Sequence, residues 1–210
     1  MQLLIEQINS IPLEVKKVID SRLKEFSSFA TKSEEEWFSE LCFCLLTANS
    51  KASTAISLQN DLGFKGFAGL SESELVEQIK SHKHRFHNTK ASRIVLARKY
   101  THIKKTIQDI IKINGESEAR EWLVKNVKGL GYKESSHFLR NTGHENLAIL
   151  DRHILNLMHE HKLISEIKPL NAKTYLATES HFNSLASRLN ISLSRLDLCM
   201  WYLRTGKVLK

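Results

Sequence analysis

Apolar residues recur at helical spacing along nearly the whole chain, and strict alternation of apolar and polar residues over five or more positions is hard to find. Only two prolines, Pro12 and Pro169, interrupt this pattern. Both features favour helices over strands. The pattern therefore predicts an all-α protein.

Capping signals place several helix ends. Ser33-x-x-Glu36 and Ser71-x-x-Glu74 have the form of capping boxes, which begin helices near 34 and 72. Gly63 and Gly143 are predicted as C-terminal caps, and Pro12 suits a first helical turn. We predict helices at 2–9, 13–27, 34–47, 51–61, 72–80, 89–112, 117–126, 133–141, 151–161, 172–189 and 193–204.

The charge of the chain points to a polyanionic partner. The 210 residues carry a net charge of +8, with a pI near 9.4. The segment from Lys80 to Lys105 holds nine Lys or Arg and no Asp or Glu. Such a block neutralises phosphates; the alternative is a solvated helix face. Nucleic acid is the leading candidate, ahead of a basic surface without a partner.

Cysteine and histidine do not indicate a cofactor. Cys42, Cys44 and Cys199 are too few for a disulfide framework, and a reducing cytosol fits them. Cys42 and Cys44 point about 200° apart on a helix, so they cannot share a metal. The histidines at 82, 84 and 87 lack a nearby carboxylate or cysteine in the sequence. We expect no metal and no cofactor.

No segment has the pattern of a signal peptide, and no apolar run reaches the roughly 18 residues of a membrane span. We therefore expect a soluble, cytoplasmic protein with no membrane partner. The sequence says nothing about oligomeric state, and a monomer is assumed.

The most informative feature is a glycine turn followed by a lysine. Gly129-Leu130-Gly131 leads through Tyr132 to Lys133, and glycines allow backbone N–H groups to approach a phosphate. The alternative is a helix that ends at glycine before another that begins with lysine. Predicted helices on both sides favour a helix-hairpin-helix at about 117–141. Lys128 adds phosphate attraction, or is simply an exposed charge.

A carboxylate follows at a suitable distance, because Asp151 comes eighteen residues after Lys133. We predict N-terminal helices at 1–30 that pack with a C-terminal lobe at 145–210, and a central lobe at 31–144. A cleft between the lobes would receive Lys133 and Asp151. Lys133 would then be an amine nucleophile that works on DNA, with the carboxylate of Asp151 facing it.

These motifs resemble those of the helix-hairpin-helix DNA glycosylases, specifically the archaeal-type (type 2) 8-oxoguanine DNA glycosylase/AP lyases. The resemblance covers nearly the whole chain, in Lys128–Lys133, Leu150–His153, Leu45–Ser50, Arg85-Phe86 and Trp201–Lys210. It implies a base-excision repair enzyme that flips 8-oxoguanine out of double-stranded DNA, excises it through Lys133 with Asp151 assisting, and nicks the strand by β-elimination. The four closely spaced cysteines that hold an iron–sulfur cluster in endonuclease III-like relatives are absent, so no cluster is expected.

The resemblance also implies a base pocket. Phe86 and Trp201 correspond to the aromatic residues that sandwich the base, whereas their spacing alone favours core positions. Lys210 would contribute to recognition of the N7–H of 8-oxoguanine through its terminal carboxylate; the alternative is a frayed basic tail. Asp197, four residues before Trp201, either faces the pocket or is an exposed helix acid.

Further residues are candidates for contacts with DNA. Asn49 would fill the gap left by the flipped base, or is a helix C-cap. His153 would touch a phosphate, or packs on its own helix. The full set of DNA-contact candidates is Asn49, Arg85, Lys128, Gly129, Gly131, Tyr132 and His153. Two other functions stay open: an oxidised-pyrimidine glycosylase/AP lyase with the same Lys133 and Asp151 chemistry, and a non-catalytic helix-hairpin-helix DNA-binding protein.

Overall fold

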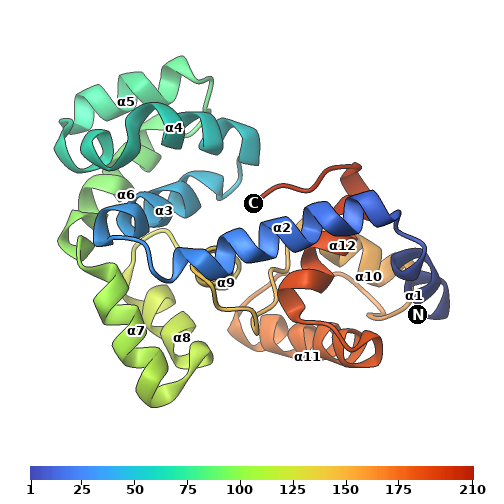
Figure 1. Ribbon diagram of the computed structural model, residues 1–210. Coiled ribbons are helices and arrows are strands. Elements are labelled where there is room, and N and C mark those ends of the chain that lie inside the picture. Colours follow the sequence, from blue (N-terminus) through green and yellow to red (C-terminus); the bar gives the residue numbers. More distant parts are fainter. The chain divides into compact units, whose positions relative to one another are not determined.

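The computed structural model describes all residues from 1 to 210 and contains twelve α-helices, one short 3₁₀ helix and no strand (Figure 1). The prediction of an all-α protein is confirmed. The helices are α1 (Gln2–Asn9), α2 (Leu13–Phe29), α3 (Glu34–Thr47), α4 (Ala52–Gly69), α5 (Glu72–Ser81), α6 (His87–Ala97), η1 (Arg98–Tyr100), α7 (Ile103–Asn114), α8 (Glu116–Asn126), α9 (Tyr132–Asn141), α10 (Arg152–Glu160), α11 (Ala172–Leu189) and α12 (Leu193–Thr205).

The chain forms two compact units. One comprises residues 1–30 and 139–210, and the other comprises residues 31–138. The second boundary therefore falls within α9, whereas the sequence placed it at 144, after that helix. The hairpin turn and Lys133 belong to the 31–138 unit, and Asp151 belongs to the other.

The 31–138 unit is built on α3. This helix is buried from Trp37 to Thr47, and α4, α6 and α7 pack on it. A helix that is apolar on most of its circumference requires neighbours on several sides. Cys42 and Cys44 both lie in this core.

In the other unit α12 is the helix on which the others pack, as α3 is in the 31–138 unit. It packs against α1, α2, α10 and α11, and Leu196, Leu198 and Met200 are buried. An ion pair between Asp20 of α2 and Arg195 of α12 joins helices that are far apart in the sequence. The first and last parts of the chain are thus held in one unit.

The two serine capping boxes are confirmed, whereas the outcomes at Gly63 and Pro12 differ from the prediction. Ser33 and Ser71 form complete capping boxes with Glu36 and Glu74. Gly63 has a φ of +53° and interrupts the helical backbone, but helical structure then resumes as far as Gly69, and the sequence prediction missed that segment. Pro12 is the N-cap of α2 rather than part of its first turn.

The single long helix predicted at 89–112 is wrong. The chain instead forms α6, the short η1 and α7, with a break at Thr101 and His102. The reason is tertiary, because the carboxylate of Glu34 accepts hydrogen bonds from the backbone N–H groups of Lys104 and Lys105, at 2.9 and 3.0 Å. These groups begin α7 and need acceptors from outside the helix. No local signal in the segment reveals a capping residue seventy positions away.

None of the helices is long and apolar enough to span a bilayer. No group of three or more His, Cys, Asp or Glu side chains is arranged to bind a metal ion. The three cysteines are free and buried.

Candidate active site

The glycine turn joins α8 to α9. Val127 and Leu130 anchor it in the core with 1% and 5% of their surface exposed, and the Leu130 N–H donates to the Val127 carbonyl at 3.1 Å. Gly129 has a φ of +106°, a conformation that side chains disfavour. The predicted helix-hairpin-helix is therefore present.

A side chain from α6 lies across this turn. An ideal Cβ on Gly129 would lie 2.4 Å from Cδ of Arg93 and 2.9 Å from its Nε. The positive φ favours glycine at position 129, and a side chain there would also displace Arg93. Nothing local in the sequence connects α6 to the turn, so Arg93 was not among the predicted site residues.

Lys133 is the second residue of α9, and its side chain is 26% exposed. Its Nζ atom lies 3.3 Å from Oε1 of Glu134, while Oε2 of Glu134 accepts a hydrogen bond from the Gly131 N–H at 3.3 Å. One carboxylate therefore contacts both the lysine amine and the glycine turn. The amide of Gly131, a candidate phosphate ligand, already has this internal acceptor.

Tyr132 is held by α8. Its hydroxyl donates to Oε2 of Glu121 at 2.7 Å, and the guanidinium of the buried Arg120 lies 5.3 Å from its ring centre. Arg120 also donates to the hydroxyl of Ser136. These contacts fix the start of α9 and engage the Tyr132 hydroxyl inside the protein.

A second lysine lies close to Lys133. Lys90 of α6 is 2% exposed, and its Nζ donates to the Leu45 carbonyl at 2.5 Å. Burial lowers the pKa of Lys90 from 10.5 to about 8, and the positive charges of Arg93 and Lys133 contribute in the same direction, against the opposing effect of Glu134. The position of Lys90 within the basic segment 80–105 gave no indication that this lysine is buried.

His84 links the end of α3 to the start of α6. Its Nε2 lies 3.0 Å from the Leu46 carbonyl, and its Nδ1 accepts from the Phe86 N–H at 3.3 Å. These partners require the tautomer with the proton on Nε2. Burial lowers the pKa of His84, consistent with a neutral ring.

Phe86 is 39% exposed, so the alternative of a core position is wrong. The Arg85 guanidinium stacks 4.6 Å from its ring centre and donates to the Asn49 carbonyl at 3.3 Å. Asn49 is exposed, with a φ of +58°, and comes one residue after Ala48, the C-cap of α3. Three of the sequence-predicted residues, Asn49, Arg85 and Phe86, are thereby brought together.

The neighbouring histidines have other roles. His82 pairs with Asp61 at 2.7 Å, a carboxylate that the sequence analysis did not associate with it. His87 contacts the carbonyl of His84 at 3.2 Å. The three rings therefore bind separate partners.

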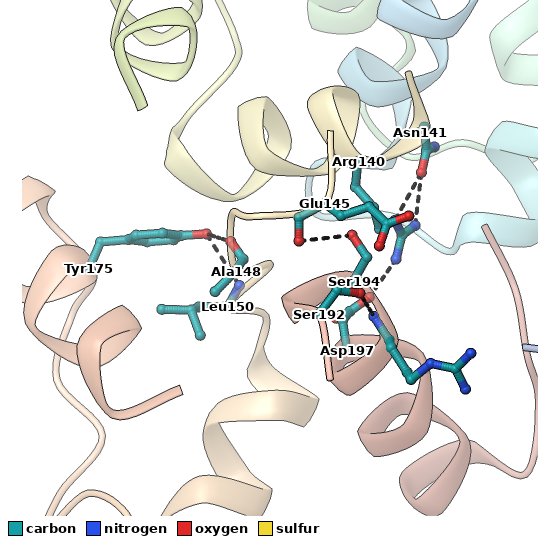
Figure 2. A network of polar contacts seen from close by, with 10 residues as sticks. Arg140, Asn141, Glu145, Ala148, Leu150, Tyr175, Ser192, Ser194 and Asp197 are labelled. Carbon is teal, nitrogen blue, oxygen red and sulfur yellow. Dashed lines mark hydrogen bonds and ion pairs between the residues drawn. The ribbon is translucent and has the colours of Figure 1, made fainter. Parts of the chain in front are cut away.

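In the other unit, Asp151 is the N-cap of α10. Its Oδ1 accepts a hydrogen bond from the Ile154 N–H at 2.9 Å, and the residue is half-buried. Figure 2 shows how the preceding segment is held: the Tyr175 hydroxyl donates to the Ala148 carbonyl at 2.7 Å and accepts from the Leu150 N–H at 3.3 Å. The backbone leading to Asp151 is therefore fixed by α11.

The rings of His153 and Trp201 meet edge to face, with centres 5.0 Å apart. The indole Nε1 of Trp201 is shielded from solvent and makes no hydrogen bond. His153 thus packs against a pocket candidate, in addition to its place in the first turn of α10.

Asp197 is 5% exposed and pairs with the buried guanidinium of Arg140 (Figure 2). The alternative of an exposed helix acid is wrong, because this buried partner compensates its charge. Arg140 also donates to Oδ1 of Asn141 and lies over the ring of Phe26. Lys210 is half-buried.

Each unit holds part of the predicted site. The 31–138 unit contains Asn49, Arg85, Phe86, Lys128, Gly129, Gly131, Tyr132 and Lys133, and the other contains Asp151, His153, Asp197, Trp201 and Lys210. The sequence did not indicate three further residues that lie near Lys133 or the glycine turn: Lys90, Arg93 and Glu134.

Comparison with known proteins decides the family. Residues 19–191 match the family model described as 8-oxoguanine DNA glycosylase. The chain belongs to this family. The prediction of family membership, made from the hairpin and aspartate motifs, is confirmed.

Relatives in the family match over their full length. The chain is 48% identical to the 8-oxoguanine DNA glycosylase/AP lyase of Methanocaldococcus jannaschii over 99% of this chain and 100% of that one. The crystal structure of the M. jannaschii enzyme in complex with a 15mer DNA containing 8-oxoguanine is similar, with a TM-score of 0.94 over 99% and 100% of the two chains at 48% identity. The Thermotoga maritima 8-oxoguanine DNA glycosylase gives a TM-score of 0.92 at 40% identity, over 100% and 99%.

Proposed function

We propose that this family member excises 8-oxoguanine from double-stranded DNA and cleaves the abasic strand. The observation that carries the proposal is Lys133, which follows the Gly129–Gly131 turn on α9 of an 8-oxoguanine DNA glycosylase family chain. The M. jannaschii relative, named as a glycosylase/AP lyase, supports both activities.

Lys133 supplies the nucleophile. The neutral amine attacks the deoxyribose anomeric carbon and the damaged base leaves with the bonding electrons. The bond between that carbon and the ring oxygen then breaks, the ring oxygen takes up a proton, and the amine remains joined to the opened sugar as a protonated imine. Loss of a proton from the adjacent carbon then expels the 3′ phosphate by β-elimination. Water forms no such imine, so strand cleavage by this route requires the lysine.

Asp151 supplies negative charge for the oxocarbenium-like sugar. The N-cap hydrogen bond from Ile154 occupies Oδ1, and this contact orients the carboxyl group. A carboxylate fixed in advance stabilises positive charge without reorganisation during the reaction. We also assign it assistance in proton transfer.

The damaged base must leave the helix before attack, at a cost of about a few kcal/mol. We assign base stacking to Phe86, exposed beside Arg85, and to Trp201, whose ring is braced by His153. Lys210 remains a candidate for base recognition. Asp197 is bound to Arg140, so we assign it to the support of α12 rather than to the base.

Phosphate contacts are assigned to the hairpin and to Arg85 and His153, and Asn49 is assigned the gap left by the flipped base. Tyr132 contributes by shaping the turn, because its hydroxyl is bound to Glu121. We also propose that the protein acts as a monomer in the cytoplasm; its free cysteines fit a reducing compartment. Sedimentation of the protein with and without DNA measures its oligomeric state and tests this proposal.

The test is a panel of matched duplexes carrying 8-oxoguanine, guanine, thymine glycol or an abasic site, each incubated with and without borohydride. Base release and a trapped adduct on 8-oxoguanine are expected. Activity on thymine glycol alone would move the function to oxidised pyrimidines, and inactivity on all four would leave a DNA-binding protein.

A further inference from the structure

The basic block from Lys80 to Lys105 separates into cations that serve the fold and cations that do not. Lys90 donates to the Leu45 carbonyl, Arg98 to those of Phe67 and Leu70, and Lys104 to that of Lys32. These three charges are bound to the protein's own backbone. The sequence offered only a phosphate-binding surface or a solvated face for the whole block.

Arg93 differs from them. It is half-buried, and its guanidinium makes no hydrogen bond and no ion pair in the structure. Arginine presents five N–H donors in a planar fork that matches a phosphate. An arginine held in place but without an acceptor points to a ligand that supplies one.

The position of Arg93 is set by the hairpin. Its Cγ, Cδ and Nε lie where a Cβ on Gly129 would stand, at 3.2, 2.4 and 2.9 Å. The stem is therefore pressed against the glycine turn, and the guanidinium extends from it. The backbone N–H groups of Lys128 and Gly129 in the same turn also make no hydrogen bond.

The surrounding charge is positive. Arg93 is one of the charges that lower the pKa of the buried Lys90, so the two cations lie close together. The carboxylate of Glu134 is already in contact with Lys133 and Gly131. Lys90 and Arg93 repel each other, and no unoccupied carboxylate nearby offsets that repulsion. A bound anion would reduce it.

We propose that Arg93 binds a phosphodiester of the DNA backbone at the hairpin turn. The inference rests on the proposed function for its ligand, and it adds a residue of α6 to a site otherwise formed by the α8–α9 turn. Because phosphate contacts carry no base information, Arg93 raises affinity for damaged and undamaged DNA equally.

The experiment measures binding in a Lys133→Gln background, so that the DNA is not consumed. Arg93→Met keeps an apolar stem against Gly129 and removes the fork, whereas Arg93→Lys keeps a charge. Lys112→Met removes an exposed charge from the last turn of α7 and is the matched control. Affinity is measured from about 50 to 200 mM salt, for duplexes with and without 8-oxoguanine.

We expect Arg93→Met to weaken binding to both duplexes about tenfold. The slope of log affinity against log salt concentration should fall in magnitude by about 1. Arg93→Lys should retain the slope, and Lys112→Met should retain both slope and affinity. An Arg93→Met slope equal to that of the parent would overturn the proposal, even if affinity fell, since a packing role alone leaves the slope unchanged. An equal loss in Lys112→Met would also overturn it.

Failure of this proposal is distinguishable from failure of the proposed function. The phosphate contact is measured on undamaged DNA, and the enzymatic function is measured as excision and trapping by the unmodified protein. Normal excision together with an unchanged Arg93→Met slope removes only Arg93 from the DNA-binding surface.

Discussion

Nζ of Lys133 lies 3.3 Å from Oε1 of Glu134, the next residue of α9, and the other oxygen of that carboxylate accepts from the Gly131 N–H. The Glu134 carboxylate thus contacts the proposed nucleophile, Lys133, and a candidate phosphate ligand, the Gly131 N–H. A phosphate that approaches the turn meets this negative charge. We therefore expect Glu134 to compete with DNA for the hairpin.

Replacing Glu134 with Gln should strengthen DNA binding about two- to fivefold. Gln keeps an acceptor for the Gly131 N–H and removes the charge; Glu134 is 14% exposed, and charge contacts near a protein surface are worth about 0.2–1 kcal/mol. Affinity for an undamaged duplex at fixed salt is the measurement. Glu134→Asp, which retains the charge, is the control, and weaker binding by Glu134→Gln would contradict the competition.

Lys133→Gln should abolish the borohydride-trapped adduct and strand cleavage while DNA affinity changes less than about threefold. Gln lacks the nucleophilic amine but has a similar length. Trapping on abasic DNA, compared with a binding isotherm for the same variant, tests the role. Trapping as efficient as that of the unmodified protein would transfer the nucleophile to another residue.

Gly129→Ala should destabilise the protein by about 2 kcal/mol or more, since it combines strain at a positive φ with overlap on Arg93. In an Arg93→Ala background only the backbone strain remains, so the cost should fall. Urea denaturation of the four proteins gives the coupling energy. Additive effects would show that the close packing contributes nothing.

The lowered pKa of Lys90 predicts that the stability of the protein depends on pH. The pKa of Lys90 is about 8 in the folded protein and 10.5 in the unfolded chain, so folding favours the neutral amine. The folded protein is therefore most stable above pH 10.5, where the amine is neutral in both states, and this stability is lost as pH falls to 8. The difference is on the order of 3 kcal/mol. The free energy of unfolding should therefore rise between pH 8 and 10, and Lys90→Met should flatten that rise. Identical profiles for the two proteins would argue against the shift.

The buried pair of Arg140 and Asp197 should be sensitive to the loss of one partner. Asp197→Asn leaves an uncompensated guanidinium in the interior, which typically costs about 3–5 kcal/mol. Thermal and urea unfolding measure the loss. Glu166→Gln, at the exposed pair with Lys168, is the control and should change stability by less than about 1 kcal/mol.

Local signals were sufficient where the stabilising contacts are local. The capping boxes at Ser33 and Ser71 bind groups only three residues away, so they predicted helix starts correctly. The Gly-Leu-Gly turn likewise predicted the hairpin, because glycine conformation and short-range packing determine it. Family membership followed from motifs of this kind.

Contacts between distant segments could not be predicted in this way. Glu34 caps α7 from seventy residues away and thereby divides one predicted helix into two. For Asp197 the sequence left open a position in the base pocket or on an exposed helix face, and neither alternative included its buried pairing with Arg140. The sequence assigns residue types to helix faces, but not the partners that meet those faces.

By itself the sequence determined an all-helical chain, its hairpin, its candidate nucleophile and its family, because helical periodicity, caps and turns depend on neighbouring residues. Only the tertiary structure decided which cations of the basic block serve the fold. Lys90 is buried against the Leu45 carbonyl, while Arg93 lies across Gly129 with its guanidinium unbound. Burial and pairing depend on the surroundings in three dimensions, and two basic residues one helical turn apart can therefore have opposite roles.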